Sequence, residues 1–128
     1  LYAHALTSQD GIVHAILQGG APLFASTWQG KTGISDPQIQ ATREWARAVK
    51  VDVTALREYS SAVASASDAY LATLKDDDVQ RIIDLTAFGL GQMTLYLIVG
   101  RLISGHLDNM TGEISCLKGL QGAKGYPI

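Results

Sequence analysis

Hydrophobic residues recur at helical spacing through the middle of this chain. From Trp45 to Leu74 the apolar positions are separated mostly by three or four residues, which places them on one face of an amphipathic helix. Asp36 and Pro37 predict where that helix begins, because aspartate accepts from the amides of a first turn and proline needs no donor there. The stripe consists of Trp45, Val49, Val53, Leu56, Tyr59, Val63, Tyr70 and Leu74.

Two further helical regions flank this stripe. The first covers about Leu1 to Trp28 and is interrupted within Gly19–Pro22, where glycine freedom and the fixed φ of proline favour a break. The segment RIIDLTAFGLGQM is interpreted as an irregular or extended connection that leads to Thr94, which is expected to cap the last helix. No strand alternation or internal repeat competes with these helices. The pattern predicts an all-α fold, an antiparallel helical bundle.

The last helix carries titratable groups on its apolar face. At about 100° per residue from Thr94 onward, His106 and Glu113 fall in the same sector as the aliphatic residues. Burial of such groups is costly unless each finds a partner. His106 is therefore either a neutral core histidine that donates to a backbone carbonyl or to Glu113, or a metal ligand in a bundle core. The sector contains Leu95, Val99, Leu102, His106, Met110, Glu113 and Leu117.

Composition bounds the class of protein. With 128 residues, 47% hydrophobic and 17% charged, the chain is expected to form a single domain spanning residues 1–128. A net charge of −2 without a basic stripe argues against nucleic acid as a partner. The longest apolar run, LYLIVG, is too short to cross a bilayer. The first residues lack the basic region and cleavage site that are typical of a signal peptide, so none is expected. A cytoplasmic location is expected.

Three smaller features have simple interpretations. Cys116 is the only cysteine, which excludes an intrachain disulfide, and it is interpreted as a small buried hydrophobe. His14 is interpreted as surface or local packing, and the charge run KDDDVQ as a solvated turn or helix start. The apolar tail LKGLQGAKGYPI is expected to pack on the bundle.

Both ends of the chain resemble the DinB-like superfamily. The C-terminal HLDNMTGEISCLKGLQGAKGYP is similar to that family's last helix, in which a histidine, three residues, a second histidine and one residue precede Gly, Glu or Gln, and Ile. His106 takes the first slot, and Met110 stands in the place of the second histidine. The N-terminal LYAHALTSQD resembles the family's second helix and puts His4 in the first ligand slot.

This resemblance implies a four-helix bundle in which three histidines hold a divalent ion, with one position open. It implies metal ligands at His4 and His106, with Met110 in the third-ligand slot and zinc or nickel as the ion. It also implies a helix before Leu1, so the bundle is expected to lack its first helix in this chain and to form a homodimer that covers the apolar surface.

Two classes of function remain open. The first is a metal-dependent transferase, isomerase or hydrolase acting on a small-molecule or thiol substrate, with no catalytic residue assigned. The second is a non-catalytic bundle that binds a small ligand or dimerises and whose metal site has decayed. Met110 favours the second class, because a thioether is a poor ligand for zinc. Retention of His4, His106 and Glu113 favours the first.

Overall fold

Helices dominate the architecture, as the sequence pattern predicts. The computed structural model describes residues 1–126, and 62% of the structure is helical. Contacts group the chain into two compact units, one formed by Tyr2–Thr73 and the other beginning at Leu74. The prediction of one domain stays a prediction. No helix within residues 1–126 has both the length and the apolar character needed to cross a membrane.

The first helical region breaks where glycine and proline predict it. Helix α1 (Tyr2–Asp10) continues directly into a π-helical segment, Gly11–Leu17. This segment ends at Leu17, and Gly19, two residues later, has a φ of 68°, in the left-handed region that favours glycine. After this break a 3₁₀ turn, Leu23–Ala25, follows Pro22.

The middle region forms two helices, so the predicted single helix from Asp36 is wrong. Helix α2 (Arg43–Ala48) is capped by Thr42, and helix α3 (Val53–Leu71) is capped by Asp52. Asp52 accepts from the first free amides of α3, which is the role that the sequence analysis gave to Asp36.

Asp36 lies instead in a loop before α2. Its carboxylate accepts a hydrogen bond from the Gln38 side chain at 2.6 Å, and its backbone carbonyl accepts from the indole of Trp45 at 2.6 Å. The chain is extended on either side of α2, where Ile34 and Val51 form an isolated antiparallel bridge. The sequence correctly predicted an aspartate cap for the central helix. The capping residue is Asp52 rather than Asp36, because α3 begins only after the break that follows α2.

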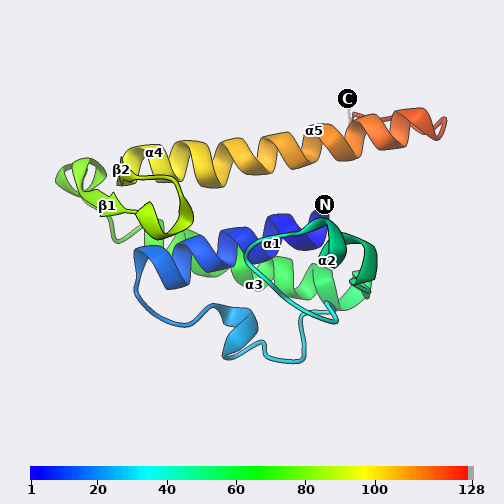
Figure 1. Ribbon diagram of the computed structural model, residues 1–128, viewed down its shortest axis with the longest axis horizontal. Helices are drawn as coiled ribbons and strands as arrows, with labels where there is room; N and C mark the ends of the chain where they lie inside the picture. Colours follow the sequence, from blue (N-terminus) through cyan, green and yellow to red (C-terminus); the bar gives the residue numbers. More distant parts are fainter. Residues whose placement is uncertain (127–128) are drawn as a thin grey trace. The chain divides into compact units, whose positions relative to one another are not determined.

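The core of the first unit lies between α1 and α3, which pack side by side (Figure 1). Leu56, Tyr59 and Val63 come from the predicted stripe and are 0–1% exposed. Val53 is 53% exposed because it begins the first turn of α3, before the helix enters the core. The buried cluster contains Ala3, Leu6, Ile34, Trp45, Leu56, Tyr59 and Val63.

A small β-hairpin departs from the all-α prediction. Strands β1 (Ile82–Asp84) and β2 (Gln92–Thr94) pair antiparallel, with Ile83 opposite Met93. The connection between them includes Gly89, whose φ of 73° permits the turn. The segment was correctly predicted to be extended, but strands of three residues are too short to show alternation in the sequence.

The last helical region begins at Thr94, as predicted, because its side chain accepts from the amide of Leu97. Helix α4 (Leu95–Leu97) leads through a π-helical segment, Ile98–Ser104, into helix α5 (Gly105–Leu120), and the three run as one continuous ribbon (Figure 1). A π-helix bonds each residue to the fifth along, so its turns are wider than those of an α-helix. The residues that follow are therefore rotated relative to a uniform α-helix.

This rotation overturns part of the predicted apolar sector. Glu113 is exposed and Leu117 is 50% exposed, so neither points into a core. Leu95, the first residue of the predicted sector, is buried as expected, but the other buried residues of this region are Ile98, Ile103 and Ser115, which lie outside that sector.

The C-terminal segment also differs from its prediction. Cys116 is exposed, next to the buried Ser115, so its interpretation as a buried hydrophobe is wrong. Gly125 lies against the backbone of Ser115, close enough that a Cβ there would come within 2.6 Å of the Ser115 carbonyl oxygen. The apolar tail side chains Leu120 and Tyr126 remain 80% and 64% exposed, and Ile128 lies outside the described residues.

Candidate functional site

His4 is held on the buried side of the first unit. It belongs to α1, between the buried residues Ala3 and Ala5, and its own side chain is partly buried. The imidazole meets the Trp45 indole edge to face, with ring centroids 6.5 Å apart and planes at 67°. This contact orients the imidazole against the Trp45 indole.

His106 and Met110 lie one turn apart on α5. Both side chains are partly buried, and the spacing of four residues in a regular α-helix puts them on the same face. Glu113, the other polar residue of the predicted sector, is exposed. The prediction that Glu113 points into a core together with His106 is therefore wrong for Glu113.

The predicted metal ligands come from both units of the chain. His4 belongs to the unit Tyr2–Thr73, whereas His106 and Met110 belong to the unit that begins at Leu74. Their predicted approach across facing helices stays a prediction. In residues 1–126 no group of three or more His, Cys, Asp or Glu side chains has an arrangement that could hold a metal ion.

A buried polar cluster in the first unit surrounds Asp10, a residue that no sequence pattern marked as a candidate. Asp10, at the end of α1, is 0% exposed, yet each carboxylate oxygen has donors. Oδ1 accepts from the amide of Leu23 at 2.9 Å and lies 2.7 Å from Nδ1 of His14. Oδ2 accepts from the amide of Phe24 at 3.0 Å and from the Tyr59 hydroxyl at 2.6 Å.

These contacts make Asp10 the junction of three segments. The amides of Leu23 and Phe24 belong to the 3₁₀ turn, the phenol belongs to α3, and His14 lies one turn further along the helix that carries Asp10. A buried carboxylate is tolerated only when it is hydrogen-bonded, and four donors satisfy it. The interpretation of His14 as local packing is confirmed by this contact.

The same cluster perturbs a tyrosine. Burial raises the pKa of Tyr59 well above its ordinary value of 10.0, and the hydrogen bond to Asp10 and the negative charge of Asp10 raise it further. Tyr59 is therefore a hydrogen-bond donor at every physiological pH. It has no means of acting as a base here, and its role is to satisfy the buried carboxylate.

Asp10 also sets the tautomer of His14. An acceptor at Nδ1 favours the proton on that nitrogen, which leaves Nε2 as the acceptor of the neutral ring. The spacing of Asp10 and His14 in the sequence, four residues apart on a helix, was the available signal for this pair. Asp10 and Tyr59 are 49 positions apart in the sequence, so no local sequence pattern predicts their contact.

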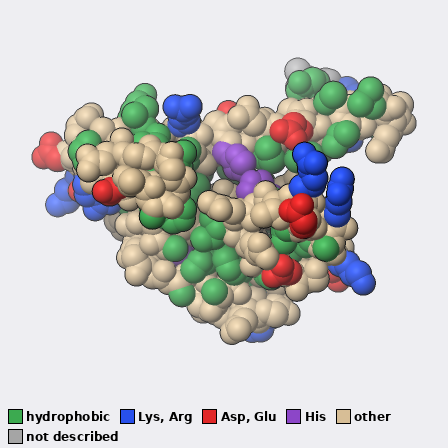
Figure 2. All heavy atoms as spheres, viewed as in Figure 1, with side chains coloured by type: hydrophobic (Ala, Val, Ile, Leu, Met, Phe, Trp, Pro, Cys, Tyr) green, Lys and Arg blue, Asp and Glu red, His purple; other side chains and the backbone are tan. Residues whose placement is uncertain are grey.

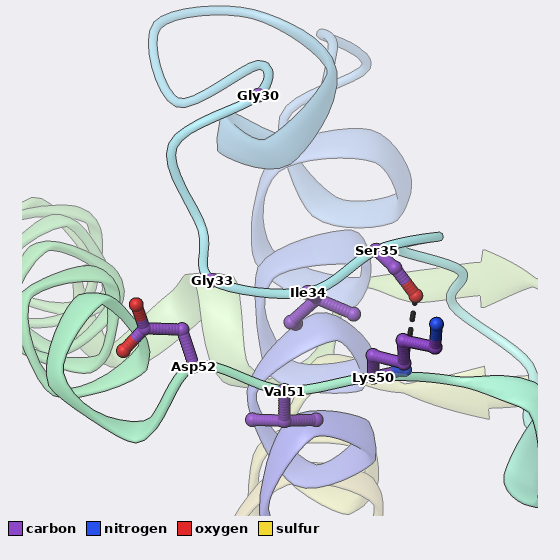
Figure 3. Close-up of a pocket in the computed structure, with 7 residues that line it drawn as sticks. All are labelled: Gly30, Gly33, Ile34, Ser35, Lys50, Val51 and Asp52. Carbon is purple, nitrogen blue, oxygen red and sulfur yellow. Dashed lines mark hydrogen bonds between the residues drawn. The ribbon is translucent and has the colours of Figure 1, made fainter.

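An open hollow lies on the first unit beside the N-terminus of α3. Its volume is about 400 Å³, and Figure 3 shows its walls, the loop that leads from Gly30 to Ser35 and the extended segment Lys50–Asp52. The Ser35 hydroxyl accepts from the amide of Lys50 at 3.0 Å. The residues that line the hollow are Gly30, Gly33, Ile34, Ser35, Lys50, Val51 and Asp52.

Comparisons with known proteins give this chain no relative. Neither a protein-family model, nor a curated protein, nor a solved structure matches it. The functional argument therefore depends on the residues themselves.

Proposed function

We propose that this chain is a DinB-like helical protein that binds a divalent metal ion through His4 and His106, with Met110 in the third-ligand slot. The pairing of His106 with Met110 carries the proposal. The two side chains share one face of α5, both partly buried, at the spacing of the family's two histidines. The fixed ring of His4 against Trp45 supports the other half of the site.

The donor set decides which ion is suitable. Two imidazoles suit zinc, nickel or copper, whereas the neutral thioether of Met110 suits softer ions. A hydrolytic zinc takes three nitrogen, oxygen or thiolate ligands and a water, and this set supplies only two of them. A bound ion would act as a Lewis acid toward the oxygen or thiol of a small-molecule substrate. The proposal therefore covers binding of an ion and assigns no reaction.

Calorimetric titration of the full chain with nickel or zinc tests the two histidines. His4→Ala and His106→Ala should each weaken binding at least about tenfold, the size expected for loss of one interaction of about 1.4 kcal/mol. His14→Gln is the matched control, because His14 contacts Asp10 and is not one of the proposed metal ligands. Native affinity in either alanine variant, with its circular dichroism unchanged, would refute the site.

A second candidate is a non-catalytic bundle that dimerises. The observation that favours it is the apolar surface near the end of α5, where hydrophobic side chains gather in the upper right of Figure 2. Leu117 is 50% exposed and Leu120 is 80% exposed, and their spacing of three residues puts both on one side of α5. A second copy of the chain would cover them.

Light scattering at micromolar concentration distinguishes this candidate. The native chain should have the mass of a dimer, and Leu117→Lys with Leu120→Lys should give a monomer. Leu90→Lys is the control, because Leu90 is 49% exposed but lies in the hairpin connection. A monomeric native chain would exclude the dimer without affecting the metal titration.

A further inference from the structure

His14 presents one ring nitrogen to a buried carboxylate and the other to solvent. Nδ1 lies 2.7 Å from Oδ1 of Asp10 and 3.1 Å from the Asp10 backbone carbonyl oxygen. The side chain is 14% exposed, and within residues 1–126 its Nε2 is neither buried nor hydrogen-bonded. By contrast, Nδ1 of His4 and Nε2 of His106 are buried. Nε2 of His14 is therefore open to a reagent from solvent.

The two acceptors at Nδ1 fix the state of this ring. They hold the proton of the neutral imidazole on Nδ1, so the lone pair is on Nε2 and points away from Asp10. Asp10 is itself held in place, because the amides of Leu23 and Phe24 and the hydroxyl of Tyr59 donate to its two oxygens. A histidine is activated as a nucleophile when a carboxylate orients its ring and stabilises the cation that forms during attack. Asp10 meets both conditions.

The surrounding charge determines which reagents are suitable. His14 lies in the last turn of the helical segment Gly11–Leu17, where the final carbonyls form the negative end of the helix dipole. This dipole and the Asp10 carboxylate favour positive charge on the ring and repel an anion. Attack on an uncharged acyl donor produces a cationic ring, whereas a phosphoryl donor brings negative charge with it. The surroundings therefore favour acyl transfer.

We propose that Nε2 of His14 is a nucleophilic modification site for uncharged, activated acyl compounds such as anhydrides and aryl esters. The Nε2 lone pair bonds to the acyl carbon while the bond from that carbon to the leaving oxygen breaks, and the leaving group departs with the electron pair. The Nδ1 proton stays against Asp10 until the leaving group or water removes it from the acylated ring. Asp10 is a positioning residue, and the site uses none of the proposed metal ligands.

Reaction of the full chain with diethyl pyrocarbonate, an uncharged anhydride, tests the proposal. Mass spectrometry of peptides taken during the reaction gives the rate at His14. Rates are compared on their alkaline plateau, where every imidazole is neutral, so that differences in protonation do not contribute. His14 should react at least about threefold faster than N-acetylhistidine. An equal or slower rate at His14 would overturn the proposal.

The role of Asp10 has its own readouts. Asp10→Asn removes the charge but keeps an oxygen acceptor, and it should slow the reaction of His14 about three- to tenfold. Asp68→Asn, an exposed change on α3, should leave the rate unchanged. The ¹⁵N chemical shifts of the His14 ring in the native chain should show the proton on Nδ1, a result that does not depend on the folding of a variant. A proton on Nε2, or the native rate in folded Asp10→Asn, would contradict the assignment.

A charged donor tests the preference for acyl groups. Potassium phosphoramidate supplies an anionic phosphoryl group, and the negative surroundings of His14 should prevent its transfer to Nε2. Native chain that remains unphosphorylated at His14 under conditions that phosphorylate N-acetylhistidine would support the proposal. Phosphorylation of both at the same rate would overturn the assignment to acyl donors.

Discussion

The hydroxyl of Tyr59 donates a hydrogen bond of 2.6 Å to Asp10 and thereby joins α3 to α1 across 49 positions of sequence. Both residues are fully buried. Removal of either partner would leave a polar group without its bond in a medium that cannot replace it. The stability of the first unit is therefore expected to depend on this pair.

Tyr59→Phe should lower the free energy of unfolding by about 1.5–3 kcal/mol, the usual size of a hydrogen bond to a charged group. Urea denaturation followed by circular dichroism measures the change. Tyr96→Phe is the control, since Tyr96 is 65% exposed and its hydroxyl should contribute less than about 0.5 kcal/mol. Equal stabilities of the two variants would show that the buried bond is not important.

The raised pKa of Tyr59 predicts loss of stability in alkali. Above pH 10.0, the ordinary pKa of tyrosine, the unfolded chain releases this proton while the folded chain retains it. The unfolded state then binds fewer protons, so stability falls as pH rises, by up to about 1.4 kcal/mol per pH unit for one group. Tyr59→Phe should flatten this dependence between pH 10 and the alkaline limit of folding. An unchanged slope would contradict the assignment.

Asp10→Ala should be more damaging than Tyr59→Phe. It removes the acceptor from two backbone amides, a phenol and an imidazole, and each buried donor left without its partner costs about 1–3 kcal/mol. Hydrogen exchange should show faster exchange at the Leu23 and Phe24 amides. Asp68→Ala, an exposed change on α3, should alter neither property. Protected amides in Asp10→Ala would contradict the described cluster.

Alanine substitution at two glycines with similar φ angles distinguishes the cost of backbone strain from the cost of steric overlap. Gly30 has a φ of 72° with open space around it, whereas Gly33 has a φ of 74° and lies against the backbone of Asp52. Gly30→Ala should cost about 1–2 kcal/mol from the left-handed conformation alone. Gly33→Ala should cost clearly more, as measured by thermal unfolding. Similar losses for both would mean that the contact of Gly33 is not tight.

The sequence predicted what local chemistry determines. The break within Gly19–Pro22 and the cap at Thr94 follow from residues close together in the chain, and both are present. The burial of Leu56, Tyr59 and Val63 follows from helical spacing. Each of these features can be predicted without knowing which distant segments are in contact.

The missed features depend on distant contacts or on irregular helix geometry. The π-helical segment Ile98–Ser104 shifts the face of α5, so uniform spacing placed Glu113 wrongly. The start of α3 at Asp52 depends on the pairing of Ile34 with Val51, which holds the chain extended before the helix. The role of Asp10 required knowing that Tyr59 lies beside it.

The central claim is that Met110 occupies a metal-ligand position together with His4 and His106. Zinc binding by the Met110→His variant tests this claim most directly. Positions 106 and 110 share one face of α5, and histidines four residues apart on a helix can hold one zinc ion together. With His4, the variant would supply three nitrogen ligands and leave one tetrahedral position for water. Calorimetric titration with zinc should show at least about tenfold tighter binding by the variant than by the native chain. Equal affinity, or tighter binding by the native chain, would contradict the account, because Met110 would then not occupy a ligand position.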